Sequence, residues 1–264
     1  MMAIPTLKNT STTLVRSSSK VRLLTLLAGL LLIAAPAARS APGPLKICLL
    51  SASEEYDSEK SLSDFQGFLE STYQVVCRRA FGKDKGGGLP GLEALTNTDL
   101  MIVFTRRVQL PPLQLEQIHK FISSGRPIIG LRTASHAFAN YPEFDLDILG
   151  GGYKGHYTNS QAEVRLVAGQ AQHPVLAGVT PFTSRKLYKN PALAAGVTVL
   201  LEGLVPGHRE PVAWARESGG RRVFYTSLGT QEDFKEESFR RLLLNAVFWT
   251  TKTNEKTTRR GKAQ

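Results

Sequence analysis

The alternation of short apolar runs with segments of helical periodicity constrains the fold of this chain most strongly. Four apolar runs predict buried strands, at residues 45–50, 73–80, 100–104 and 127–131. Residues 61–71 and 112–124 instead have apolar side chains at helical spacing. Strands that alternate with helices in this order are typical of a parallel sheet with right-handed crossovers.

The second half of the chain has a different pattern of apolar and polar residues. A long polar, glycine-rich stretch covers residues 132–160. Four strand-like segments follow, at 163–167, 197–202, 211–216 and 222–227. Residues 237–250 form a final amphipathic helix with a wide apolar face. We therefore expect one α/β domain over residues 41–251, with an open, mixed or mostly parallel sheet and helices on both faces.

The two ends of the chain carry most of its formal charge of +11. Residues 1–40 contain five basic side chains and no acid. Within them, a basic stretch ends at Arg22, an apolar run of 13 residues extends from Leu23 to Ala35, and small residues follow. This pattern predicts a signal peptide over 1–40 and export to the periplasm or the medium, the alternative being an uncleaved anchor. No integral membrane segment is expected after cleavage.

The C-terminal residues 252–264 are polar and basic, and they predict a disordered basic tail, with attachment to a cell surface as an alternative use. The remaining chain is nearly neutral, which argues against a nucleic-acid partner.

Cys48 and Cys77 lie in apolar runs, so buried free thiols are favoured over a disulfide. The sequence leaves a homo-oligomer open.

Polar residues follow several of the predicted strands, at the edge where open α/β sheets bind ligands. Arg106 follows the third strand, Arg132, Thr133 and His136 the fourth, and Thr230 and Glu232 the last. The segment from Pro127 to Phe138 has the form of a nucleophile elbow, with Arg132 at the turn. Arginine is no nucleophile but binds carboxylates, phosphates or hydroxyls. The alternative is an internal ion pair of Arg132 with a nearby acid.

The histidines have no spacing that indicates a metal site, so neither a metal nor another cofactor is expected. His136 and His156 follow glycine-bearing turns and could meet at the same edge of the sheet. The loop at 150–157 is either a plain glycine turn or a lid that brings His156 and Tyr157 to the pocket. Ser135 and His136 are adjacent in sequence, which does not favour a catalytic pair.

A family resemblance covers about residues 45–250. The segments LMIVFTRR, GRPIIGLRTASHAF, HPVLAG, SRKLYKNP, PVAWARESGGRRVFYTSLGTQEDF and FRRLLLNAVFWT follow one another in an order that resembles ThuA-like (trehalose-utilisation) proteins. That family is a branch of the class I glutamine amidotransferase-like superfamily. The resemblance implies a flavodoxin-like three-layer sandwich, a pocket at the former amidotransferase site and a link to carbohydrate metabolism, including keto-sugars.

Two departures from the wider pattern affect the chemistry. Amidotransferases carry Cys at the elbow, where this chain has Arg132, so glutamine hydrolysis through a thioester is not expected. Many relatives carry His after the last strand, where this chain has Thr230.

The leading hypothesis is an exported enzyme, a hydrolase, lyase or isomerase, that acts on a sugar or keto-sugar. In this hypothesis His136 or His156 is the general acid/base, and Glu232 or Asp233 orients a hydroxyl or the histidine. The predicted substrate-binding residues are Arg106, Arg132, Thr133, Tyr188 and Thr230. The alternative is a non-catalytic domain that binds a glycan or a protein.

Overall fold

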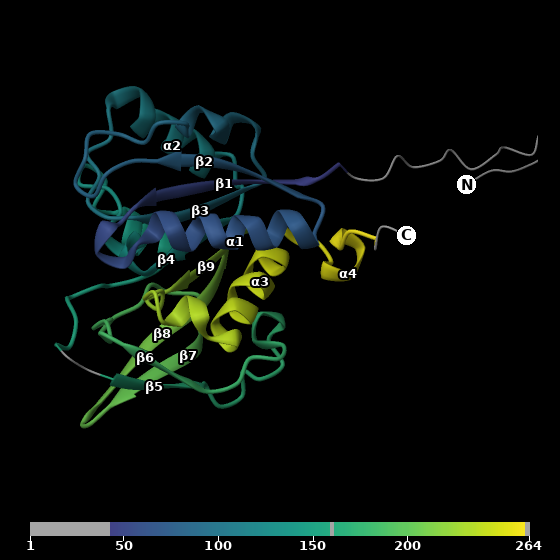
Figure 1. The fold of residues 1–264 in the computed structure, drawn as a ribbon. Coiled ribbons are helices and arrows are strands. Elements are labelled where there is room, and N and C mark those ends of the chain that lie inside the picture. Colours follow the sequence, from purple (N-terminus) through teal and green to yellow (C-terminus); the bar gives the residue numbers. More distant parts are fainter. Residues whose placement is uncertain (1–42, 159–160, 262–264) are drawn as a thin grey trace, which may run out of the picture. The chain divides into compact units, whose positions relative to one another are not determined.

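A nine-stranded mixed sheet forms the frame of the computed structural model, which describes residues 43–158 and 161–261 (Figure 1). The strand order is β2-β1-β3-β4-β9-β8-β7-β5-β6. The strands are β1 (Leu45–Ala52), β2 (Val75–Phe81), β3 (Leu100–Thr105), β4 (Ile128–Leu131), β5 (Gln161–Leu166), β6 (Phe182–Arg185), β7 (Val197–Val205), β8 (His208–Ser218) and β9 (Arg221–Thr226). The α-helices are α1 (Ser58–Thr72), α2 (Pro112–Ser123), α3 (Glu237–Thr251) and α4 (Glu255–Thr258). A single α/β domain was expected and is confirmed.

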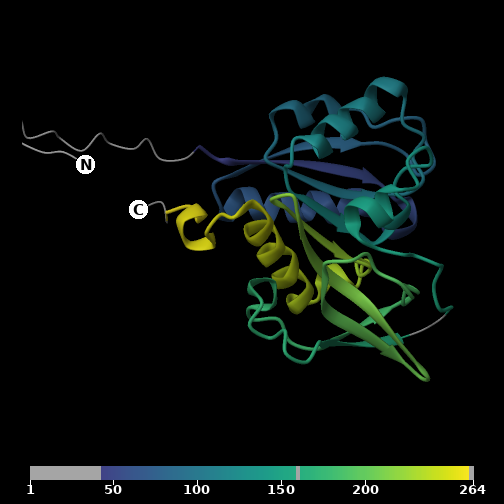
Figure 2. The ribbon, with the colours of Figure 1, turned by 180° about the vertical axis from the view of Figure 1, so that it is seen from behind.

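The sheet has a parallel half and an antiparallel half. Strands β2, β1, β3, β4 and β9 pair in parallel, and β9, β8, β7, β5 and β6 pair in antiparallel. Figures 1 and 2 place the strands β5–β8 on one side of β9 and the strands β1–β4 on the other. The prediction of a mostly parallel sheet is therefore wrong. Strands β7, β8 and β9 follow one another through short turns, and such short connections join antiparallel neighbours.

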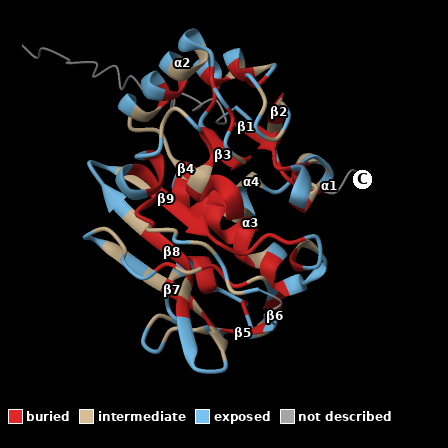
Figure 3. Ribbon diagram, turned by 90° about the vertical axis from the view of Figure 1, so that its left-hand side faces the viewer, coloured by how far each residue is buried: buried red, intermediate tan, exposed pale blue. Residues whose placement is uncertain are grey.

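The helices pack on the sheet through two apolar clusters. Alternate residues of β1 belong to different clusters, with Ile47 and Leu49 in one and Cys48 and Leu50 in the other. This division follows from the alternation of side chains along a strand. Helices α1 and α3 contribute to the first cluster and α2 to the second. Figure 3 shows α3 and the adjoining strands as the most continuously buried region of that view.

The C-terminal segment differs from the prediction of a disordered tail. Residues 255–258 form helix α4, and Arg259 makes a β-bridge with Tyr73. The Tyr73 hydroxyl donates to Glu255 at 2.9 Å, and Glu255 also pairs with Arg241 of α3 at 3.1 Å. Partners distant in sequence therefore order residues 252–261, although their local composition is polar.

The predicted signal peptide at 1–40 lies outside the described residues. Within residues 43–158 and 161–261, no helix has both the length and the apolar character that a membrane span requires. Cys48 and Cys77 are free and buried, as expected. Burial raises the pKa of each thiol to about 12, so both are protonated at neutral pH.

Candidate functional site

A polar pocket of about 510 Å³ lies beyond the carboxyl ends of β1 and β9. The described residues that line it come from both halves of the sheet. They are Glu55, Tyr56, Gln161, Arg185, Lys186, Thr230, Gln231 and Glu232. Thr230 and Glu232, predicted from the sequence, line this pocket, whereas His136 and His156 are not among the described lining residues.

Arg132 is the turn residue immediately after β4, and its φ of 45° places it in the left-handed region. A non-glycine residue there costs about 1–3 kcal/mol, which the surrounding structure must offset. The Tyr225 hydroxyl donates to the Arg132 carbonyl at 2.8 Å. The elbow predicted from the sequence is thus present, but its side chain points into the protein and is 1% exposed.

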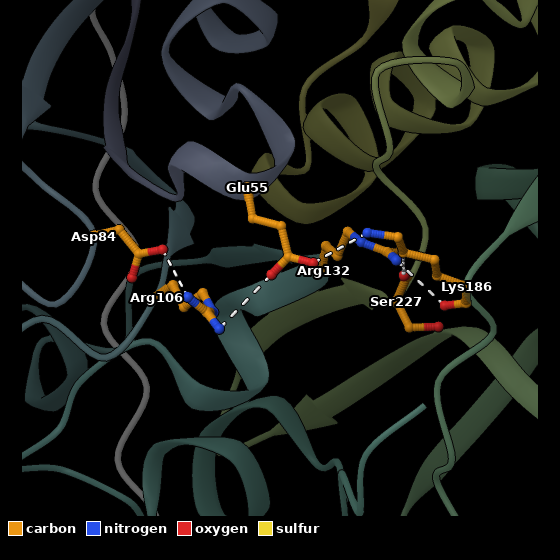
Figure 4. Close-up of polar contacts among 6 residues, drawn as sticks. All are labelled: Glu55, Asp84, Arg106, Arg132, Lys186 and Ser227. Atoms are coloured by element: carbon orange, nitrogen blue, oxygen red, sulfur yellow. Dashed lines mark hydrogen bonds and ion pairs between the residues drawn. The ribbon is translucent and has the colours of Figure 1, made fainter. Parts of the chain in front are cut away.

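The guanidinium of Arg132 joins several loops. It donates to the Ser227 carbonyl at 2.7 Å and to the Lys186 carbonyl at 3.2 Å (Figure 4). Its central carbon lies 4.1 Å from the ring centroid of Tyr56 and 4.7 Å from that of Tyr188. Burial opposes the charge, but the pKa of Arg132 is raised because Tyr188 and Tyr56 favour the charged form. Arg132 therefore forms the support behind the Tyr56 wall of the pocket.

A chain of ion pairs connects loops along the same edge of the sheet. Arg106, after β3, pairs with Asp84 at 2.8 Å and with Glu55 at 3.7 Å. Glu55 also accepts a hydrogen bond from the Lys186 ammonium at 3.1 Å (Figure 4). Partial burial favours the neutral form of Glu55, but its pKa is lowered by Lys186, Tyr56 and Arg106. Glu55 is therefore a carboxylate at neutral pH, with one oxygen facing each cation.

His136 lies in an aromatic stack. Its ring centroid is 4.7 Å from that of Tyr153, and Tyr153 is 4.5 Å from Tyr188. Burial, with Arg107 and Arg106 nearby, lowers the pKa of His136 to about 4. The imidazole is therefore neutral at pH 7 and a weak base. Its Nδ1 lies 3.1 Å from the Ser135 hydroxyl, a contact that orients the ring.

The two predicted histidines both lie against Tyr188. His156 makes a β-bridge with Tyr188, and their ring centroids are 6.4 Å apart. His136 is 6.3 Å from Tyr188. Burial raises the pKa of Tyr188 well above its usual value, so its hydroxyl stays protonated. Tyr188, predicted to bind substrate, is thus a buried residue packed against both histidines and Arg132, and it is not among the described lining residues of the pocket.

The turn after β9 is fixed by Asp233, which is fully buried. Its carboxylate accepts the backbone amides of Gly229 and Thr230 at 2.7 and 2.8 Å, and the Thr230 hydroxyl accepts the Asp233 amide at 3.2 Å. Asp233 therefore orients the backbone of the pocket wall, where the sequence suggested a hydroxyl or a histidine as its partner. Glu232 is exposed on the pocket. Thr133 is fully buried, and it is not among the described lining residues.

The glycine loop after residue 149 is tightly packed. A Cβ at Gly151 would lie 2.2 Å from Asp145 Oδ1, and one at Gly152 would lie 2.1 Å from the Ala192 carbonyl oxygen. Asp145 Oδ2 accepts the Tyr153 amide at 3.0 Å. This loop is therefore a fixed support that places Tyr153 in the aromatic stack.

Several pocket residues were missed by the sequence reasoning. Glu55 and Tyr56 lie in the polar segment after β1, and no motif in the sequence singles them out. Lys186 lies in the SRKLYKNP segment, and its φ of 55° is a strained feature that no local pattern reveals.

Residues 43–158 and 161–261 contain no group of three His, Cys, Asp or Glu side chains that could hold a metal ion.

Comparison with known proteins identifies the family. The family model described as "ThuA: Trehalose utilisation" matches residues 80–250. The chain belongs to the ThuA family. ThuA is a class I glutamine amidotransferase-like family, and the resemblance inferred from the sequence is confirmed. No curated protein matches the chain.

Solved structures similar to this ThuA-family chain support the fold. A ThuA-like protein from Bacteroides uniformis ATCC 8492 is 18% identical, with a TM-score of 0.62, over 84% of this chain and 98% of that one. A ThuA-like protein from Parabacteroides merdae ATCC 43184 is 17% identical, with a TM-score of 0.60, over 79% and 90%. A β-galactosidase from Bacillus circulans sp. alkalophilus is 13% identical, with a TM-score of 0.53, over 82% of this chain and 32% of that one.

Proposed function

We propose that this ThuA-family chain binds a small carbohydrate in the pocket between Glu55, Lys186 and Glu232 and acts in carbohydrate catabolism. The lining of that pocket carries the proposal. It combines the ring of Tyr56 with carboxylate, ammonium, amide and hydroxyl groups, and its volume of about 510 Å³ suits a small ligand. Sugars present hydroxyls to polar side chains and their C–H faces to aromatic rings. The family's trehalose-utilisation description supports the same class of ligand.

The same proposal excludes glutamine amidotransferase activity. That chemistry requires a nucleophile at the elbow that can form and release an acyl intermediate. The guanidinium of Arg132 is charged at all ordinary pH values and is committed to two carbonyls and two tyrosine rings. Arg132 supports the pocket wall instead.

More specifically, the proposal is that the chain converts a keto-sugar in a hydrolase, lyase or isomerase reaction. Glu232 is then the preferred acid/base group because it is exposed on the pocket. A non-catalytic glycan-binding domain is the second candidate, and the placement of His136 in a stack outside the described lining favours it. Export through residues 1–40 remains part of the proposal, with the periplasm or the medium as the compartment.

Calorimetric titration of the full chain with mono- and disaccharides and their 3-keto forms tests the proposal. Glu232→Gln should weaken sugar binding roughly tenfold, since hydrogen bonds to a charged group contribute about 1.5–3 kcal/mol. Glu143→Gln is the matched control, because Glu143 is exposed and lies outside the described lining. Unchanged binding by the Glu232 variant, or binding of no sugar by a cooperatively melting protein, would contradict it. Product formation from a bound keto-sugar would show that the protein is an enzyme and not a non-catalytic binding domain.

A further inference from the structure

The ion pair between Glu55 and Lys186 lies on the wall of the proposed sugar pocket. Glu55 Oε1 accepts from the Lys186 ammonium at 3.1 Å, and Oε2 lies 3.7 Å from the Arg106 guanidinium. Each carboxylate oxygen thus faces a different cation. The Glu55 side chain is 37% exposed and that of Lys186 is 45% exposed, so solvent and ligands reach the pair.

Each of the two cationic residues also has a contact that does not involve Glu55. Arg106 is held by Asp84 at 2.8 Å, and the Asp84 side chain is only 11% exposed. The backbone of Lys186 is held by the Arg132 guanidinium through the Lys186 carbonyl at 3.2 Å. The Lys186 ammonium also lies 5.1 Å from the Tyr56 ring centroid. If the carboxylate between the cations leaves, Arg106 therefore keeps Asp84 as its partner, and the Lys186 backbone keeps its contact with Arg132.

Glu55 is the member of this group that both cations share. It lies in a 3-10 helix of three residues directly after β1, and its side chain is the more exposed partner of Arg106. Two cations that share one carboxylate form a receptor for a second carboxylate, because each ligand oxygen can take the place of one Glu55 oxygen. A sugar bound in the pocket that Glu55 and Lys186 line would carry such a group to the cations.

We propose that the ligand of this pocket is an acidic sugar whose carboxylate replaces Glu55 between Lys186 and Arg106. This inference rests on the proposed function, since it specifies the class of carbohydrate. In the free protein, Glu55 occupies the cations and competes with the ligand. Removal of its charge therefore strengthens binding of a sugar acid, whereas a neutral sugar has no carboxylate that could gain from it.

The test is calorimetric titration of the full chain at pH 7.5 and low salt with D-glucuronate, D-glucose and D-glucose 6-phosphate. Glu55→Gln should bind glucuronate about two- to fivefold more tightly than the natural chain, as expected for release of a partly exposed ion pair. Glucose affinity should show no such gain. Lys186→Met keeps the aliphatic stem and should lose most of the preference for glucuronate over glucose.

Glu232→Gln is the matched comparison, because it removes the same charge from the same pocket and leaves the Glu55–Lys186 pair intact. It should weaken both sugars alike. An equal gain in glucuronate affinity in the two Gln variants would show that the effect comes from the net charge of the pocket. That result would overturn the specific role of Glu55. A gain confined to glucose 6-phosphate would overturn the carboxylate assignment.

The failures of the two proposals are distinguishable. If glucose binds and Glu55→Gln leaves glucuronate affinity unchanged or weaker, the proposed competition between Glu55 and the ligand carboxylate is wrong. The proposal of a carbohydrate pocket then still holds. If neither sugar binds the natural chain or any variant, and all melt cooperatively, both proposals fail. If Glu55→Gln gains glucuronate binding that the natural chain lacks, the competition is supported.

Discussion

The parallel and antiparallel halves of the sheet bury their residues differently. Strand β3 of the parallel half is buried at all six positions, and β4 at all four. In the antiparallel half, β5 alternates between exposed and buried positions along its first five residues. Parallel strands read as continuous apolar runs because elements cover both faces, whereas an antiparallel strand with one solvated face alternates. Figure 3 shows the same contrast, with blue outer parts on β7 and β8.

The candidate pocket takes residues from both halves. Glu55 and Thr230 follow strands β1 and β9, while Lys186 follows β6 at the far edge of the antiparallel half. Arg132 links the two sides by donating to the carbonyls of Ser227 and Lys186. The parallel half thus supplies a rigid edge, and the antiparallel half supplies the second wall of the pocket.

Removal of the link at Arg132 should have the largest effect. Arg132→Ala would leave the Ser227 and Lys186 carbonyls without their donor and open a void between Tyr56 and Tyr188. We expect a loss of about 3–5 kcal/mol in the free energy of unfolding, from lost buried hydrogen bonds and a cavity. Urea unfolding measures it.

Arg132→Lys is the matched variant, since it keeps the charge and loses the planar fork. It should lose most of the same stability, because one ammonium cannot reproduce both the two hydrogen bonds and the stacking. A loss below about 1 kcal/mol in the Ala variant would mean that Arg132 does not join the halves.

The burial contrast between the halves gives the next prediction. Leu49 of β1 is fully buried, whereas Leu166 of β5 is half-buried. Leu49→Ala should cost about 2–5 kcal/mol, and Leu166→Ala less than about 2 kcal/mol, because the second side chain loses less contact and leaves a site open to water. Urea unfolding of the two variants compares them directly. Equal losses would show that the antiparallel half is packed as tightly as the parallel half.

The sequence predicted the parallel half better than the site. The runs at 45–50 and 100–104 and the helix at 237–250 were predicted to within two residues, because burial on both faces or a wide apolar face leaves a strong local signal. Strand β6 has only four residues and was missed. Its pairing with β5 depends on contacts that a local pattern does not contain.

The candidate site was predicted only in part, because some of its contacts join residues that are distant in sequence. The rim loops and the Arg132 elbow follow from strand ends, and Thr230 and Glu232 line the pocket as expected. Glu55 and Lys186 are 131 positions apart in sequence, so nothing local indicates that they pair. The order of residues 252–261 was missed likewise, since Glu255 is held by Tyr73 from 182 positions away.

The buried Asp145 and the half-buried His136 titrate in opposite senses, so their net effect on the natural chain is the smallest of these predictions. Burial raises the pKa of Asp145 to about 6 from 3.8, so its contribution to stability is present below pH 3.8 and is lost as pH rises to about 6. The pKa of His136 is lowered to about 4 from 6.5 by burial and by Arg107 and Arg106, so its contribution is present above pH 6.5 and is lost as pH falls to about 4. Between pH 4 and 6 the two contributions oppose each other, and each amounts to about 3 kcal/mol at most.

Variants separate the two titrations. Asp145→Asn keeps an oxygen for the Tyr153 amide, and its unfolding free energy should rise with pH between 4 and 6, because the His136 contribution is then unopposed. His136→Gln should show the reverse, a fall over the same range. The natural chain should vary less than either variant, as measured by urea unfolding at pH 4, 5 and 6. Parallel pH profiles for the natural chain and Asp145→Asn would mean that the Asp145 carboxyl is hydrated.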